Sequence, residues 1–154
     1  MNAGGNVAYC HIVDGVDCNI AASNLLHYPN GLVKGMDGLF YVPSAVTGEI
    51  SVLKLESNRT LSELHRIKDV PMPIDNLFVD TTGRIFAAGS PKVMSLIESM
   101  DNFTVNPPST IWGIEKLGNE YKTTKVLEDS EAKVLPGSTV ALHDAKTGRL
   151  FLGG

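Results

Sequence analysis

Hydrophobic and polar positions along the 154-residue chain repeat one short pattern three times. In each copy, polar or Gly-containing residues open a short apolar run, a turn ends in glycine, and a second apolar run follows. The copies span residues 30–42, 73–89 and 137–153, and their turns end at Gly38, Gly83 and Gly148. These glycines are 45 and 65 residues apart. A period of about 45 residues, with an insertion in one unit, is the spacing of the blades of a β-propeller.

The pattern predicts an all-β chain of four units. A half blade occupies residues 7–22, complete blades occupy 31–67 and 76–127, and a second half blade occupies 138–152. The expected strands are 7–13, 18–22, 31–34, 39–43, 49–55, 60–67, 76–80, 84–88, 110–115 and 121–127. The apolar run 92–98 is either a third strand or one or two turns of helix, because so short a run does not decide. Residues 101–109 are expected to be irregular and to account for the longer second period.

The inner strands of the units are apolar on both faces, as in Leu77-Phe78-Val79 and Val140-Ala141-Leu142. A strand buried on both faces has this composition. Each blade of a propeller packs both faces on its neighbours, whereas strands of a two-sheet sandwich alternate more cleanly. The pattern therefore favours a partial propeller arc of about three blades. Because rings typically close with about 4–8 blades, we expect that part of the ring is missing from this chain or that two arcs associate.

The two cysteines flank a predicted hairpin turn at Asp14-Gly15. With a two-residue loop there, Cys18 would face His11 and Cys10 would lie on the opposite face, which makes a disulfide between them awkward. We therefore expect two small buried hydrophobic side chains. The absence of paired CxxC spacing also argues against a structural zinc site.

Composition and charge exclude several classes of function. The net charge is −4 and the basic residues are dispersed, so no basic stripe predicts a nucleic-acid partner. No apolar run approaches the roughly 20 residues that a membrane span needs, and the first residues do not form a signal peptide. Two sequons, Asn58-Arg59-Thr60 and Asn102-Phe103-Thr104, permit N-glycosylation if the parent protein is secreted.

Polar residues open the inner strands of successive units, at Asn30, Asp75, Asn76 and Ser138. The first strand of each propeller blade runs nearest the central axis, so these side chains are expected to converge there. Carboxylate and amide oxygens are ligands suited to Ca²⁺, which takes six to eight oxygens. The alternative is that Asn-Gly and Asp-Asn only cap turns and bond to local backbone.

The segments His27-Tyr28-Pro29-Asn30-Gly31-Leu32, Ile74-Asp75-Asn76-Leu77-Phe78-Val79-Asp80 and Gly137-Ser138-Thr139-Val140-Ala141 resemble the C-terminal half of paraoxonase-like proteins. These are calcium-dependent arylesterases and lactonases with six-bladed propellers, related to gluconolactonase and regucalcin. The resemblance implies that Asn30, Asp75 and Asn76 are ligands of a catalytic calcium and that the substrate is a small ester or lactone.

Other parts of the site implied by the resemblance have no counterpart in this chain. Its remaining calcium ligands and its histidine base belong to the absent first half, and Ser90-Pro91 stands where the family often has a histidine before a proline. His27 is a weak candidate for a catalytic residue, and more simply a loop residue with local hydrogen bonds. The expected function is a fragment of a calcium-dependent ester or lactone hydrolase, inactive alone; the alternative is a propeller that serves as a binding scaffold. The sequence contains no Gly-x-Ser-x-Gly segment, which argues against a serine hydrolase.

Overall fold

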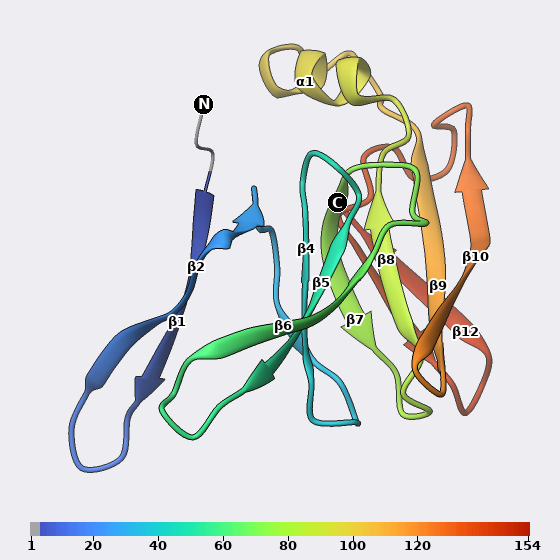
Figure 1. The fold of residues 1–154 in the computed structure, drawn as a ribbon. Helices are drawn as coiled ribbons and strands as arrows, with labels where there is room; N and C mark the ends of the chain where they lie inside the picture. The colour runs from blue at the N-terminus through green and yellow to red at the C-terminus, as the bar shows by residue number, and fades with distance from the viewer. Residues whose placement is uncertain (1–3) are drawn as a thin grey trace.

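Four antiparallel sheets follow one another along the chain in the computed structural model, which describes residues 4–154 apart from the side chains of Asn24 and Leu25 (Figure 1). The first sheet consists of β1 (Gly4–His11) and β2 (Asp17–His27). The second consists of β3 (Val33–Lys34), β4 (Phe40–Pro43), β5 (Ile50–Leu55) and β6 (Leu61–Ile67). The third consists of β7 (Ile74–Val79), β8 (Ile85–Gly89), β9 (Ser109–Leu117) and β10 (Glu120–Asp129). The fourth consists of β11 (Val140–Asp144) and β12 (Arg149–Gly153).

In both four-stranded sheets each strand pairs with the next one in sequence. The first three sheets lie in chain order from left to right in Figure 1, and the fourth lies behind the third. The chain is therefore all-β, and its architecture is compatible with a partial propeller arc. Residues 92–98, for which the sequence allowed either a strand or a helix, belong mostly to a short helix, α1 (Val93–Asp101), which joins β8 to β9. Within residues 4–154 no helix is long and apolar enough to cross a membrane.

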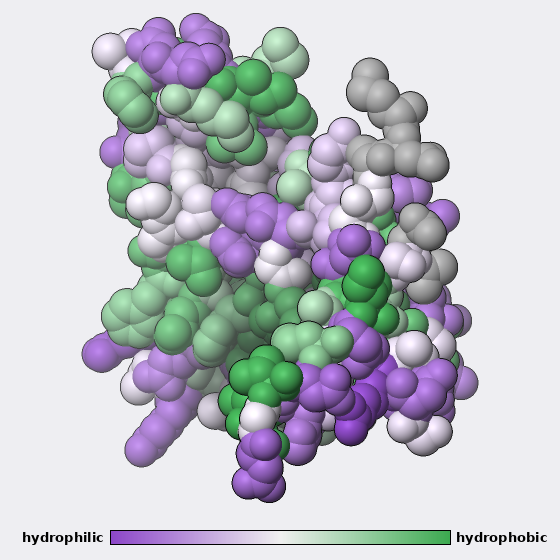
Figure 2. Space-filling view, turned by 90° about the vertical axis from the view of Figure 1, so that its left-hand side faces the viewer, coloured by the Kyte–Doolittle hydropathy of each residue, from purple (hydrophilic) through white to green (hydrophobic). Residues whose placement is uncertain are grey.

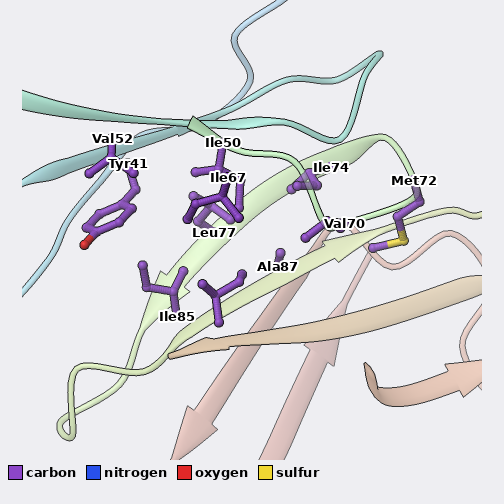
Figure 3. Packing of buried hydrophobic residues seen from close by; sticks show 11 residues of the cluster. Tyr41, Ile50, Val52, Ile67, Val70, Met72, Ile74, Leu77, Ile85 and Ala87 are labelled. Carbon is purple, nitrogen blue, oxygen red and sulfur yellow. The ribbon is translucent and has the colours of Figure 1, made fainter. Parts of the chain in front are cut away.

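The main hydrophobic core lies between the second and third sheets (Figure 3). Ile50 and Val52 of β5 face Leu77 of β7 and Ala87 of β8 across this interface, and three of these four side chains are fully buried. The connection from β6 to β7 also enters the core through Val70. Burial of such aliphatic side chains stabilises the fold by about 1.5–3 kcal/mol each.

The third sheet is covered on both faces. Its other face contributes Phe86 and Ile111 to a cluster with Ala141 of β11, and Phe78 packs there while Leu77 packs in the main core. This confirms for β7 the prediction of an inner strand apolar on both faces. For β11 the prediction of burial on both faces does not hold. Ala141 is buried, but Val140 and Leu142 are exposed, together with Phe151 of β12.

The prediction for the cysteines is wrong. Cys10 and Cys18 form a disulfide with a Cα–Cα distance of 4.1 Å, and both residues are exposed rather than buried. The loop contains residues 12–16 instead of two residues, so that Cys10 pairs with Cys18 and His11 with Asp17 in the strand register. With the five-residue loop, Cys18 lies opposite Cys10 rather than opposite His11, so the disulfide can form.

Candidate functional site

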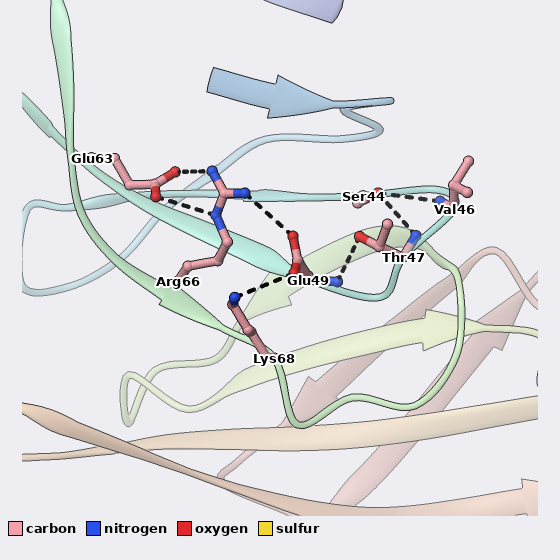
Figure 4. Close-up of polar contacts among 7 residues, drawn as sticks. All are labelled: Ser44, Val46, Thr47, Glu49, Glu63, Arg66 and Lys68. Carbon is pink, nitrogen blue, oxygen red and sulfur yellow. Dashed lines mark hydrogen bonds and ion pairs between the residues drawn. The ribbon is translucent and has the colours of Figure 1, made fainter. Parts of the chain in front are cut away.

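The turn between β4 and β5 brings two distant segments together. Ser44 stabilises this turn, because its Oγ accepts hydrogen bonds from the N–H groups of Val46 and Thr47 (Figure 4). The carbonyl oxygen of Ser44 accepts a hydrogen bond from the N–H of Ile74, at 3.2 Å. Next to it, the N–H of Asn30 donates to the carbonyl oxygen of Pro43 at 3.0 Å. The turn therefore holds the loop before β3 beside the start of β7.

An ion-pair network supports the strand that leaves this turn (Figure 4). Arg66 of β6 donates to Glu63 at 2.5 Å and to Glu49 at 3.3 Å, and Lys68 lies 3.8 Å from Glu49. The hydrogen bonds that Arg66 donates to Glu63, together with the negative charges of Glu63 and Glu49, raise the pKa of Arg66 above its ordinary value. The network fixes Glu49, the first residue after the turn.

Gly48 makes the turn sensitive to a single methyl group. Its φ is +73°, and an added Cβ would lie 2.2 Å from the carbonyl oxygen of Met72 and 2.3 Å from that of Val70. We expect Gly48→Ala to lower the free energy of unfolding by more than the roughly 1–2 kcal/mol that a left-handed alanine costs, as measured by denaturant unfolding. Gly38→Ala is the matched control, since Gly38 has φ +80° but nothing within 4 Å of an added Cβ. Equal losses for both variants would contradict the predicted clash.

Three of the predicted site residues converge beside this turn. The Nδ2 of Asn30 donates to the Oδ1 of Asp75 at 2.6 Å, and the Nδ2 of Asn76 donates to the same oxygen at 3.1 Å. Asn76 also donates to the carbonyl oxygen of Thr139, at 3.1 Å. The cluster therefore joins the second, third and fourth sheets at the N-terminal end of β7.

Gly31 allows the close approach of the loop to β7. Its φ is +76°, and an added Cβ would lie 3.0 Å from the Oδ1 of Asn76 and 3.4 Å from the carbonyl oxygen of Asp75. A side chain at position 31 would therefore be strained and would push Asn76 away from Asp75.

Ser138 lies at the edge of the cluster but is committed to the backbone. It is buried, its N–H donates to the Oγ of Ser109 at 2.6 Å, and its Oγ lies 3.2 Å from the carbonyl oxygens of both Val140 and Gly153. We therefore assign Ser138 a role in anchoring β11, and its hydroxyl is less available to a ligand than the three side chains above.

A cavity of about 180 Å³ opens beside Asn30 and Asp75. Its walls include Ser138 and Thr139 on one side and Leu96 and Met100 of α1 on the other. In Figure 1 the helix lies beyond the end of the sheets at which β7 begins. The cavity is therefore lined by polar side chains near Asp75 and by apolar side chains of α1.

The cluster fits part of a calcium shell. The Oδ2 of Asp75 and the Oδ1 of Asn30 accept no hydrogen bond from any described residue. Together with Oδ1 of Asp75 and of Asn76, four side-chain oxygens are at hand, whereas Ca²⁺ takes six to eight. Amide groups reverse their oxygen and nitrogen with little change of shape, so both asparagines can present oxygen to a cation. Within residues 4–154 no group of three or more His, Cys, Asp or Glu side chains is arranged to hold a metal.

Comparison with known proteins decides the family. The profile of the Arylesterase family matches residues 5–154. The chain belongs to the arylesterase family. No curated protein matches the chain.

Two further positions of this arylesterase-family chain can now be placed. Ser90, which stands where the resemblance expects histidine, is buried and lines the cavity beside Asp75. His27 is exposed and lines a separate small pocket with Arg66. Its ring makes no hydrogen bond to any residue in the described part of the chain, so the structure does not bring His27 together with Asn30, Asp75 and Asn76.

An Asp–His pair at the other end of β7 was not predicted from the sequence. The Oδ2 of Asp80 lies 2.7 Å from the Nδ1 of His143, and its Oδ1 accepts hydrogen bonds from Thr82 and from the N–H of Arg84. Burial works to raise the pKa of Asp80, but these hydrogen bonds together hold it below the ordinary value of 3.8. The ring of His143 also packs on Phe86, with centroids 4.6 Å apart. The pair therefore fastens β11 to the turn between β7 and β8.

The Asp–His pair lines a larger cleft of about 720 Å³. Asp37 and Tyr41 lie in the same cleft, where Asp37 accepts hydrogen bonds from the Tyr41 hydroxyl at 2.9 Å and from Lys116 at 2.6 Å. Burial, with the neighbouring Tyr121 hydroxyl and Asp37, raises the pKa of Tyr41 well above its ordinary value. The ionisable groups of this cleft are thus largely paired with one another.

Proposed function

We propose that this arylesterase-family chain supplies part of the calcium centre of an enzyme that hydrolyses small esters or lactones. The convergence of Asn30 and Asn76 on the carboxylate of Asp75 supports the proposal, because it gathers oxygen-bearing side chains beside a cavity that Asn30 and Asp75 line. Residues that only cap local turns would not need to meet across 45 residues of sequence, as Asn30 and Asp75 do.

Each residue of the site has a distinct task in this proposal. Calcium, when bound, supplies Lewis-acid polarisation of the ester carbonyl. Asp75 balances the cation charge, and the amide nitrogens of Asn30 and Asn76 donate to its carboxylate and fix its position. The amide oxygens of the two asparagines add neutral ligands. Leu96 and Met100 of α1 exclude water from one side of the cavity and contact the apolar part of the substrate. Exclusion of water strengthens electrostatic interactions in the site.

The four side-chain oxygens are too few to complete the shell. We propose that further ligands and a general base come from additional sheets of a ring, six-bladed by resemblance, or from an associated second arc. The 154-residue chain alone is then a fragment without activity.

The test compares the complete protein with this chain in hydrolysis of phenyl acetate and of a simple lactone. Calcium-dependent activity is expected in the complete protein, which should also melt at a lower temperature after chelation. The isolated chain is expected to show no activity above background. Activity of the isolated chain would show that the missing groups are not essential.

A second candidate is a non-catalytic binding scaffold. The observation that favours it is the cleft of about 720 Å³ at the other end of the sheets, which is larger than the cavity beside Asp75. An unchanged melting curve in the presence of chelator would support this alternative.

A further inference from the structure

The first and fourth sheets are complementary halves of one four-stranded sheet. β1 and β2 lead directly into β3, as β6 leads into β7, so this pair corresponds to the last two strands of a complete sheet. β11 and β12 follow β10 as β7 and β8 follow β6, so they correspond to the first two strands. Joined in the order β11-β12-β1-β2, the two pairs would reproduce the strand order of the second and third sheets.

The strand edges that such a joint needs are free and unprotected. Among the described strands, β1 pairs with β2 alone and β12 pairs with β11 alone. Edge strands usually carry charged residues or proline, which hinder pairing with another chain. The outer strands of the complete sheets do so, with Glu63 and Arg66 in β6 and Lys122 in β10. In contrast, β1 contains no proline and no Lys, Arg, Asp or Glu, and β12 has only Arg149 at its first position.

Each two-stranded sheet leaves an apolar part of its neighbour uncovered. β11 packs against the inner strands β7 and β8 of the third sheet, where Ile111 is buried with Ala141. On the outermost strand of the same sheet, Leu127 lies opposite Ile111 and therefore points to the same face, but it is exposed. β2 packs against the outermost strand β6 of the second sheet, whereas Leu32, just before the innermost strand β3, is exposed.

The two-stranded sheets themselves each have one exposed apolar face. On the fourth sheet this face carries Val140, Leu142 and Phe151, of which Phe151 is 56% exposed. On the first sheet it carries Ile20, which is 60% exposed and lies opposite Ala8. Figure 2 views the molecule from the side on which β1 and β2 lie in Figure 1, and it shows apolar residues gathered in the middle and lower left of this surface.

We propose that two copies of this chain associate head to tail into a closed ring, in which β12 of one copy pairs with β1 of the other. Residues 4–154 form twelve strands, so two copies supply six sheets of four, within the range of about 4–8 blades at which propellers close. Head-to-tail contacts generate a closed ring when the rotation between copies closes. An arc equal to three blades is half of a six-bladed ring, so two copies suffice.

The ring would bury the exposed apolar faces at two identical junctions. At each junction, Phe151 and Leu142 of one copy would pack on the second sheet of the other copy, near Leu32. In return, Ile20 of the other copy would pack on the third sheet of the first, near Leu127. Every uncovered surface described above would thus receive a partner of the same apolar character, which favours a second copy as the occupant.

The consequence for calcium rests on the proposed function. Both copies would direct Asn30, Asp75 and Asn76 toward one axis. The four side-chain oxygens of one copy would become eight, which reaches the six to eight that Ca²⁺ takes. The second copy repeats the same side chains and adds no new general base, so the isolated chain is still expected to lack hydrolytic activity.

Sedimentation velocity of the 154-residue chain tests the ring directly. A species of twice the 16.5 kDa of one chain is expected at micromolar concentrations. Phe151→Asp and Ile20→Asp should each raise the dissociation constant by about thirtyfold or more, the scale of an interface hot spot. Phe103→Asp is the control, because Phe103 is 91% exposed in the turn after α1, outside both junction faces. Circular dichroism verifies that each variant is folded, and a wild-type chain that remains a monomer overturns the proposal.

Mixing the two variants tests the head-to-tail arrangement. In a dimer of Phe151→Asp with Ile20→Asp, both substitutions fall at one junction and the other junction is wild-type. The mixture should therefore form heterodimers more tightly than either variant forms homodimers. If Ile20→Asp instead stayed a full dimer while Phe151→Asp became a monomer, two fourth sheets would be packing on each other, and the ring would be overturned.

Native mass spectrometry in the presence of calcium separates the ring from the proposed function. One calcium ion per two chains is expected, and Asp75→Asn should remain a dimer without calcium. A dimer that binds no calcium would support the ring and contradict the proposed calcium centre. Calcium bound to a chain that stays monomeric would support the calcium centre and overturn the ring.

Discussion

Replacement of Asp75 by alanine is expected to reduce calcium-dependent ester hydrolysis by the complete protein by about a hundredfold or more, the scale of losses at metal and transition-state contacts. Asp75 is the charged member of the cluster and accepts hydrogen bonds from both Asn30 and Asn76. Its loss would remove two oxygens from the proposed calcium site and release both amides. The measurement is kcat/KM for phenyl acetate at several calcium concentrations, together with the melting temperature with and without chelator.

Two variants make this result specific. Asp75→Asn keeps the shape of the side chain but removes the charge, and should weaken calcium binding without unfolding the protein. Asp69→Ala removes a carboxylate from an exposed position outside the cavity and should leave both activity and calcium response unchanged. If Asp75→Ala retained full activity and its melting temperature still fell on chelation, the assignment of Asp75 to the calcium site would be lost.

Replacement of Asp80 by alanine is expected to lower the free energy of unfolding by about 1.5–3 kcal/mol or more, the scale on which a hydrogen bond to a charged group stabilises a fold. Asp80 is buried, and its two oxygens accept bonds from His143, Thr82 and the N–H of Arg84. Removing the carboxylate leaves these donors without their partner and loosens β11 from β7. Urea unfolding, followed by far-UV circular dichroism, measures the loss.

Asp144 provides the matched control because it occupies the corresponding turn of the fourth sheet. Its carboxylate also accepts bonds within the turn, from the N–H of Lys146 and the hydroxyl of Thr147, but it makes no hydrogen bond to a neighbouring sheet in the described part of the chain. Asp144→Ala should therefore cost clearly less than Asp80→Ala. Similar losses would mean that the contact with His143 adds no stability beyond the turn itself.

The pH dependence of stability has a defined direction for Asp80. Its pKa in the folded protein lies below 3.8, so its contribution is fully present above the unfolded value of about 3.8. That contribution is lost as the pH falls through the lower folded pKa. The difference in unfolding free energy between the wild-type protein and Asp80→Ala should accordingly shrink below about pH 4 and stay constant between pH 5 and 6 as far as Asp80 is concerned.

Much of the local structure could be predicted because it depends on short segments. The turn after Asp80 needs a glycine at positive φ, and Gly83 has φ +88°. Alternating turns and apolar runs likewise predicted the hairpin of β7 and β8 and that of β11 and β12. Convergence of Asn30 with Asp75 was also expected, because similar positions in successive units approach one axis.

Features that depend on loop length or distant packing could not be predicted in this way. The disulfide depends on a five-residue loop that the Asp14-Gly15 signal did not reveal. The short run 92–98 suits either a strand or a helix, and it becomes α1 beside the cavity. His143 had no recognisable partner in the sequence, because Asp80 comes from another sheet.

The amino-acid sequence by itself determined that this protein is an all-β chain of short hairpins with oxygen-bearing side chains at equivalent strand starts. These properties follow from turn chemistry and residue periodicity, which act over a few residues. Only the tertiary structure decided that Asn30 and Asn76 bond to one oxygen of Asp75, that His143 pairs with Asp80, and that α1 covers the cavity. Such contacts join separate sheets, and their geometry follows from how the apolar faces of those sheets pack.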